Sequence, residues 1–252
     1  MFKYKQITDV LGRCILDGRG FPAIEVEILS EDGEIGRAAV SLELPEEHME
    51  ELAESMILFI NTSIADMLIG ENILSQNHID QILGRMAGID QKKNMRSQAA
   101  RVVSCAAART AANSFGIPLY QYLGGIQIQT CPTVRICLSK GKEEDTFCQS
   151  AINKWKKIYR KTNVIWEEQE HDSEKKIDTG SYTTISQYLR EIRSWKKELR
   201  DPIVLKDNGY VLDDFIVDLA IASEVDVLEL RPPVCGENTV KYSQLMRIQE
   251  HL

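Results

Sequence analysis

Residues 13–27 read RCILDGRGFPAIEVE, and this stretch decides how the first part of the chain folds. Two apolar-rich runs, Gln6–Leu16 and Ala23–Leu29, flank the turn signal Asp17-Gly18-Arg19-Gly20. A third run, Gly36–Val40, follows a second turn that contains a glycine. Because the runs are short and the connections between them are tight, the pattern predicts a three-stranded antiparallel meander.

Helical patterns follow the meander, with apolar residues recurring every three and four positions. The first helix opens near Leu44-Pro45-Glu46, where proline and acidic residues suit a helix N-terminus. The last is rich in alanine, which lets a neighbour pack closely, and its end is marked by Gly116 and Pro118. The expected helices run to residue 60 and over 64–68, 76–86 and 95–115.

After Gly124-Gly125 the pattern changes, because short apolar runs now alternate with helical segments. This alternation predicts about four βα units and a mainly parallel sheet. The highly charged segment 167–179 is expected to be a mobile loop. The expected strands are 133–138, 163–166, 203–205 and 225–230, and the expected helices are 146–160, 184–199, 212–223 and 239–251.

Composition limits the classes of function. The chain has 252 residues and a formal net charge of −8, which argues against nucleic acid and against an anionic membrane surface as partners. No apolar run approaches the ~20 residues of a membrane span, and we expect no signal peptide in the opening MFKYKQITDVLGRC. Six scattered cysteines without a CxxC pair favour reduced thiols and a cytoplasmic location.

Several short segments of the sequence resemble segments of the enolase family. They are RCILDGRGFPAIEVE at 13–27, RAAV at 37–40, GIPLYQYLGG at 116–125, FIVDLA at 215–220 and KYSQLMRIQE at 241–250. Each segment alone is weak evidence, but the segments occur in the same order along the chain as in enolase. The resemblance covers 1–125 and 203–252, whereas 126–202 matches weakly.

The resemblance implies an α+β capping domain of enolase type over 1–125, followed by an α/β domain over 126–252. A complete eight-stranded barrel needs about 200 residues or more. The 127 residues of the second segment suit about four βα units. We therefore expect a partial rather than a complete TIM barrel.

The residues that enolase uses for catalysis are not matched. Enolase removes a proton next to a carboxylate with a lysine base, a carboxylate acid and two magnesium ions. The serine loop after RAAV reads SLELPE at 41–46, and the phosphate-binding word aligns to 205–208. The lysine that grips substrate falls at Glu229. We therefore assign no catalytic or substrate-binding residue, and the only candidates for a residual metal ligand are Asp201, Asp207 and Glu229.

Four charged residues match positions that pair across the enolase dimer: Arg13, Glu25, Arg247 and Glu250. All four keep the residue type of the family. The resemblance thus implies a dimer interface, with a second copy of this chain or a full-length enolase as the partner. The alternative is that these are ordinary exposed charges.

The sequence therefore favours a catalytically inactive enolase-like pseudoenzyme that acts as a binding, regulatory or scaffold protein and needs no cofactor. One alternative is a residual or altered magnesium-dependent lyase of glycolysis, which converts 2-phosphoglycerate to phosphoenolpyruvate. In that case Glu167, Glu168, Asp207 and Glu229 are the available carboxylates. A decayed gene product is a third alternative, which the intact turns and helix ends disfavour.

Overall fold

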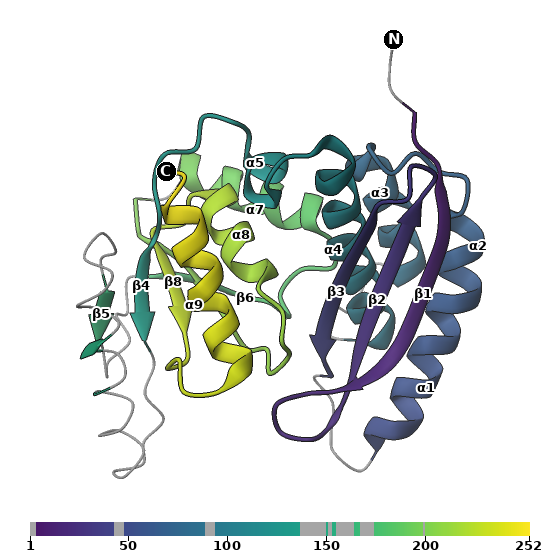
Figure 1. Ribbon diagram of the computed structural model, residues 1–252, viewed down its shortest axis with the longest axis horizontal. Helices are drawn as coiled ribbons and strands as arrows, with labels where there is room; N and C mark the ends of the chain where they lie inside the picture. Colours follow the sequence, from purple (N-terminus) through teal and green to yellow (C-terminus); the bar gives the residue numbers. More distant parts are fainter. Residues whose placement is uncertain are drawn as a thin grey trace.

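The computed structural model describes residues 4–42, 48–88, 94–136, 174–198 and 200–252, the helical positions 150, 153 and 154, and the backbone of 164–166. Within these residues the chain forms two separate sheets (Figure 1). The first sheet is antiparallel and lies on the right of the view, and the second is parallel and lies on the left.

The first sheet confirms the predicted meander. It has the order β1-β2-β3 and two antiparallel pairs. Gly20 has a φ of 82°, a left-handed conformation that glycine adopts without strain, and it closes the turn between the first two strands. The strands are β1 (Ile7–Leu16), β2 (Pro22–Ser30) and β3 (Ile35–Ser41).

The helices of the first part up to α4 also follow the predicted pattern, and a short helix, α5, was not predicted. The alanine-rich helix α4 packs against β3, and the contact is close: a Cβ added at Gly36 would lie 2.3 Å from the backbone nitrogen of Thr110. The helical elements are α1 (Met49–Phe59), the π-helical turn η2 (Ile60–Ile64), α2 (Ala65–Leu68), α3 (Gln76–Ala87), α4 (Met95–Phe115) and α5 (Leu119–Gly124). Residues 43–47, where the first helix was expected to open, lie outside the described residues.

The free edge of β1 is covered by side-chain and backbone groups of its own chain. The amide of Asn61 accepts a hydrogen bond from Gly12 N at 2.6 Å and donates one to Gly12 O at 3.0 Å. Ile7 exchanges two backbone hydrogen bonds with Gly70 and Glu71. Such covering keeps an edge strand from pairing with other chains.

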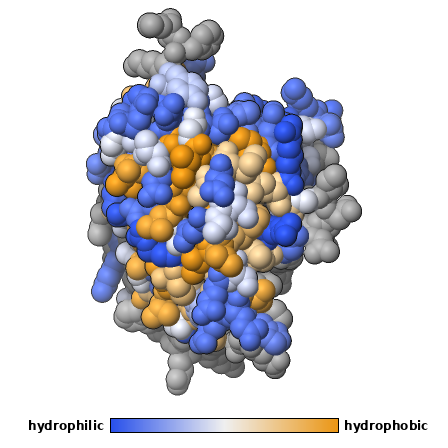
Figure 2. All heavy atoms as spheres, turned by 90° about the vertical axis from the view of Figure 1, so that its right-hand side faces the viewer, coloured by the Kyte–Doolittle hydropathy of each residue, from blue (hydrophilic) through white to orange (hydrophobic). Residues whose placement is uncertain are grey.

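The face that carries β1, α1 and α2 is nevertheless partly apolar, as Figure 2 shows. Among the exposed large apolar side chains, Leu11, Leu58 and Met67 come from these three elements, and Ile69 follows α2. Asn61 and Glu71 occupy backbone hydrogen-bonding groups of β1. A molecule that binds to this face would therefore mainly contact side chains.

The second sheet contains five strands, all in parallel pairs, in the order β5-β4-β8-β7-β6. The reduced α/β domain is thereby confirmed, with one strand more than predicted. The strands are β4 (Thr133–Ile136), β5 (Val164–Trp166), β6 (Lys175–Asp178), β7 (Ile203–Lys206) and β8 (Val227–Leu230). The helices are α7 (Ile185–Glu198), α8 (Phe215–Ser223) and α9 (Gly236–Gln249).

The additional strand lies in the segment that was expected to be a loop. Lys175–Asp178 pairs with β7 along its whole length, although its sequence, KKID, has a single apolar residue. The prediction of a loop was wrong for these four residues because only Ile177 of the strand is fully buried, so the apolar signal was weak. Residues 167–173 and most of the predicted helix 146–160 lie outside the described residues.

The strand order identifies the sheet as part of a barrel. Across the sheet, β6, β7 and β8 follow one another in chain order, and so do β4 and β5. The last strand of the chain, β8, pairs with the first strand of this sheet, β4. A closed parallel barrel has this cyclic order. Here the pair that would close the circle, β5 with β6, is the one that does not form in the described residues. In the described residues the sheet therefore corresponds to a barrel that is open between β5 and β6, while its first and last strands, β4 and β8, still pair.

A small set of contacts joins the two sheets. The turn after β1 reaches the second part of the chain, where Gly18 N donates to Tyr210 O at 2.7 Å and the Arg19 guanidinium stacks on the Tyr210 ring at 4.0 Å. At another contact, Gly124 packs closely against Ala222, whose carbonyl oxygen would lie 2.4 Å from an added Cβ. The predicted division of the chain at residue 125 stays a prediction.

Candidate functional site

The two faces of the parallel sheet differ in polarity. Strand side chains alternate, and one face carries buried apolar residues, among them Val134, Leu205 and Leu228. The register places three charged residues side by side on the other face, where Arg135 of β4 pairs with Glu229 of β8 and Glu229 pairs with Lys206 of β7. In a parallel barrel the catalytic side chains come from the carboxyl ends of several strands. This face is thus the place to look for chemistry.

The charges on this face neutralise one another. Lys206 Nζ lies 3.0 Å from Glu229 Oε1, and Arg135 Nη1 lies 3.7 Å from Glu229 Oε2. Arg135 also donates two hydrogen bonds to Glu174, at 2.7 and 2.5 Å. The side chains of Arg135, Glu174 and Glu229 are at most 5% exposed, so each charge is held by a partner instead of by water. We call Arg135, Glu174, Lys206 and Glu229 the charge ladder.

A second buried ion pair closes the end of β7. Asp207 directly follows β7 and accepts a hydrogen bond from Lys241 of α9. The two side chains are 4% and 3% exposed. Asp207 Oδ1 also accepts from Gly209 N at 3.0 Å, which folds the loop back over the strand end. Asp207 is therefore engaged on both oxygens by its own chain.

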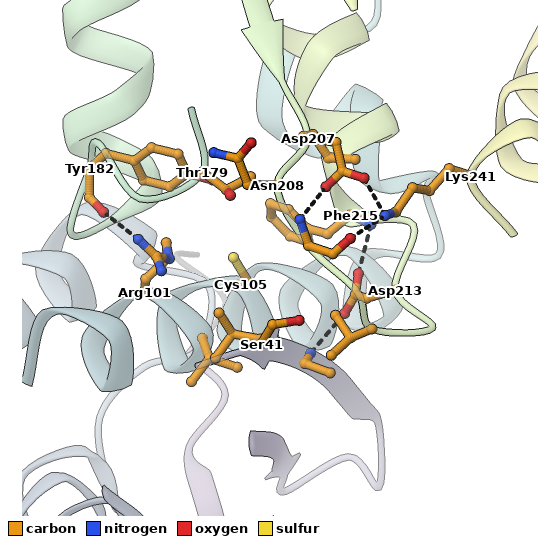
Figure 3. Close-up of a pocket in the computed structure, with 16 residues that line it drawn as sticks. Ser41, Arg101, Cys105, Thr179, Tyr182, Asp207, Asn208, Asp213, Phe215 and Lys241 are labelled. Carbon is orange, nitrogen blue, oxygen red and sulfur yellow. Dashed lines mark hydrogen bonds and ion pairs between the residues drawn. The ribbon is translucent and has the colours of Figure 1, made fainter. Parts of the chain in front are cut away.

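A cavity of about 80 Å³ lies between this strand end and the first part of the chain (Figure 3). Arg101 and Cys105 of α4 reach it from one side, and Asp207 and Lys241 from the other. Small-molecule sites usually occupy 300–1,000 Å³. Burial raises the pKa of the Cys105 thiol well above its usual range, so this cysteine is neutral and unreactive at physiological pH. The cavity offers room for a few water molecules and no activated nucleophile among the residues described.

Next to the cavity, Arg109 of α4 and Asp213 lock the two parts together. Arg109 Nη1 and Nη2 each donate to Asp213 at 2.8 Å, and Arg109 Nη2 donates to Asp214 at 2.6 Å. Asp213 also accepts from Ala39 N of β3 at 2.8 Å. Burial opposes ionisation of Asp213, but the charge and hydrogen bonds of Arg109 outweigh it, and the pKa lies below its usual value. This junction is structural, since its groups are all paired.

The three candidate metal ligands are not brought together. Asp207 and Glu229 belong to the two sets of ion pairs just described. Asp201 lies before the start of β7, at the opposite end of the strand from Asp207, and six strand-like residues span about 20 Å. Magnesium is held by oxygen ligands that are free of cationic partners. The residues present here do not fit a magnesium ion, and within the described part of the chain no group of three potential ligands clusters. Glu167 and Glu168 lie outside the described residues.

The four residues of the predicted interface lie in two places. Arg13 and Glu25 face each other across β1 and β2, with Arg13 Nη1 3.0 Å from Glu25 Oε1, and Arg13 also pairs with Glu27. Arg247 lies on α9, where it donates to Gln244 at 3.0 Å, and Glu250 follows the helix. Arg13 and Glu25 thus already pair with each other inside one chain. The resemblance to enolase predicted pairs between two chains and did not predict this one.

Sequence reasoning also missed the cationic half of the charge ladder and Lys241. The signal was present, since TVRI, IVLK and VLEL each place one charged residue in an otherwise apolar strand. A charge inside a buried parallel strand needs a partner, and strands that pair can supply it. What the sequence could not give is which strands are neighbours.

No helix in the described ranges is long and apolar enough to span a membrane. Residues 7–123 match the family model described as the N-terminal domain of enolase. The match covers the antiparallel sheet and the helices up to the last residues of α5.

Proposed function

Because the chain carries an enolase N-terminal domain over residues 7–123, which relates it to the enolase family, we propose that it is a catalytically inactive relative of enolase. In this proposal it acts by binding a partner, as a regulatory or scaffold protein in the cytoplasm. The observation that supports the loss of catalysis is the charge ladder. The position where the resemblance puts a substrate-binding lysine holds Glu229, and the side chain is paired with Lys206 and Arg135.

The chemistry of dehydration makes this argument stronger. The reaction needs a base, an acid and divalent metal to stabilise the charge that develops on the substrate. Glu229 and Asp207 are buried and bound to cationic side chains, so neither is available to hold a metal. Glu229 also occupies Lys206 and Arg135 in ion pairs, so these cations are already neutralised and are less available to a phosphorylated acid.

A coupled assay tests this part of the proposal. Purified protein, with millimolar magnesium and 2-phosphoglycerate, is expected to form no phosphoenolpyruvate above a control without protein. Magnesium is also expected to leave the melting temperature where a matched concentration of sodium chloride leaves it. Product formation, or a magnesium-specific rise in melting temperature, would support a residual lyase and overturn the proposal.

The partner proposal depends on Arg13, Glu25, Arg247 and Glu250. Arg13 and Glu25 belong to a row of paired charges on the outer face of β1–β3, which continues from Arg13 to Glu27 and from Glu27 to Arg37. Arg247 is 62% exposed on α9 and retains one weak ion pair at 3.9 Å. Charged side chains of this kind mainly set the register and the choice of partner. A second copy of the chain, or a full-length enolase, is the partner that the resemblance suggests.

Mass photometry of the chain, alone and mixed with the enolase of its source organism, tests the partner. A dimer, either of the chain alone or mixed, is expected. The variant Arg247→Glu should shift it toward monomer, whereas Lys197→Glu, an equal charge reversal at an exposed site on α7, should leave it unchanged. Monomers in both samples would contradict the partner proposal and leave the question of catalysis untouched.

A further inference from the structure

A second pocket lies away from the sheet ends, between α3, α5 and α7. Its volume is about 590 Å³, within the range of small-molecule sites. The turn before α3 and its first residues form one wall, the end of α5 forms the base, and α7 forms the other wall. It shares no lining residue with the cavity at the end of β7.

The lining of this pocket includes two arginines and one histidine. Arg190 and Arg193 come from α7, three residues apart and therefore on one face of the helix. His78 comes from α3, and its Nε2 lies 3.0 Å from the carboxylate of Glu71, which is not a lining residue; no acidic residue is among the described lining. The whole chain has a net charge of −8, so this is a local basic site on an acidic protein.

The two arginines are available and their helix is fixed in place. The only hydrogen bond of Arg190 in the described residues is from Nε to Ser186 O of its own helix at 3.2 Å, and Arg193 has no partner among them. The start of α7 is tied to the first part of the chain, because Ser186 N donates to Asp80 at 2.8 Å and Ile185 N to Ser104 at 3.1 Å. Hydrogen bonds thus fix the start of the helix that carries both lining arginines.

The rest of the lining is partly apolar. Leu74, Tyr122 and Leu189 pack against the hydrophobic core with one side and line the pocket with the other. Ser75, Asn77, Gln81 and Ser186 add neutral hydrogen-bonding groups. A mainly polar lining with two arginines at one side and an apolar strip formed by four residues matches a ligand with an anionic end and a small apolar body.

We propose that this pocket binds a small organic anion. Arg190 and Arg193 hold its phosphate or carboxylate through paired N–H donors, and Leu74, Tyr122 and Leu189 contact its apolar body. The ligand is thus a compound such as a phosphate monoester or a carboxylic acid with an aromatic or aliphatic group. The site is separate from the function proposed above, because it needs neither a partner chain nor the ends of the parallel strands.

Nuclear magnetic resonance titration of the ¹⁵N-labelled full chain tests this proposal. Phenyl phosphate, benzoate and the neutral benzyl alcohol serve as probes. At least one anion is expected to shift the amide signals of 74–78, 122–123 and 186–193 and to bind more tightly than benzyl alcohol. Comparison of phenyl phosphate with benzoate then distinguishes a phosphate from a carboxylate ligand.

Three variants provide the control. Arg190→Gln and Arg193→Gln are each expected to weaken anion binding about fivefold, as exposed charged contacts do. Lys197→Gln removes the same charge from an exposed site on the same helix outside the pocket and should bind like the unchanged chain. The proposal is overturned if no probe shifts these amides, if benzyl alcohol binds as tightly as both anions, or if both arginine variants bind like Lys197→Gln. The spectrum of each free variant shows that it is folded.

Discussion

Removal of the Asp213 carboxylate should destabilise the protein more than any other single change at the junction between its two parts. Asp213 accepts four hydrogen bonds: from Ala39 N at 2.8 Å, from Phe215 N at 2.7 Å and from two nitrogens of Arg109 at 2.8 Å. Its side chain is 9% exposed and that of Arg109 is 18% exposed. In Asp213→Ala the Arg109 guanidinium loses two charge-assisted bonds, and the Ala39 N–H loses its acceptor.

The expected cost follows from these contacts. Breaking a buried ion pair by removing one partner costs about 3–5 kcal/mol. Arg109 keeps two other acceptors, Asp214 at 2.6 Å and Arg37 O at 2.6 Å, so the lower end of this range applies. We expect Asp213→Ala to lower the free energy of unfolding by about 3 kcal/mol. Asp214→Ala is the matched control, and since that side chain is 25% exposed and has one bond to Arg109, we expect about 1 kcal/mol.

Urea denaturation at pH 7, followed by circular dichroism and by tryptophan fluorescence, gives both values. The same experiment near pH 3 adds a test of sign. The folded-state pKa of Asp213 lies below its usual value of about 3.8 in an unfolded chain, so its contribution to stability is present above that pH and is lost as the pH falls through the folded-state pKa. The difference between the original chain and Asp213→Ala should therefore shrink in acid. Equal costs for the two variants, or a cost below 1 kcal/mol for Asp213→Ala, would refute the reasoning.

Three further changes test other parts of the structure. Burial raises the pKa of Asp218 to about 6. The protonated side chain therefore stabilises the folded state fully below pH 3.8, and this contribution is lost as the pH rises through 6. The free energy of unfolding of Asp218→Asn, measured by urea denaturation, should thus rise by about 1.4 kcal/mol relative to that of the original chain between pH 5 and pH 8. Gly36→Ala should cost at least about 2 kcal/mol because the new methyl group would lie 2.3 Å from the Thr110 backbone, whereas Gly84→Ala, at an open helical site, should stabilise by about 0.5–1 kcal/mol in the same assay. Glu229→Lys should restore no dehydratase activity and should lower the melting temperature, because it puts a third cation into the charge ladder; an unchanged melting temperature would mean that the ladder is not formed in solution.

Much of the fold could be predicted because its signals are local. The turn at 17–20 and the alternating strands around it determine the meander, and helical spacing locates α1, α3 and α4. Four of the five parallel strands were found as apolar runs. β6 was missed because KKID has the composition of a loop, and it becomes a strand through its backbone pairing with β7. Its signal is therefore tertiary.

The candidate site was predicted only in part, for the same reason. Asp207 and Glu229 were singled out because they are carboxylates at positions that align with substrate-binding residues of enolase, and the structure places both near strand ends. Their partners Lys241 and Arg135 are 34 and 94 positions away in the sequence, and the pairings depend on which strands and helices become neighbours. Without that topology a carboxylate near a strand end cannot be distinguished from half of an ion pair.

The strand order adds an argument about catalysis that does not depend on any single residue. β4 pairs with β8, so the first and last strands of the sheet still meet as they do in a closed barrel. β5 ends at Trp166 and β6 begins at Lys175, so only eight residues connect the two strands that do not pair. Within the described residues the sheet has five strands, whereas a complete barrel of this kind has eight. Barrel enzymes draw their catalytic groups from the ends of several strands around the circle. In the part of the chain that the structure describes, the strands form only part of such a circle, and Arg135 and Lys206 are each paired with Glu229. Both the topology and the side-chain pairing therefore support our proposal that the chain uses its enolase N-terminal domain for recognition and not for chemistry.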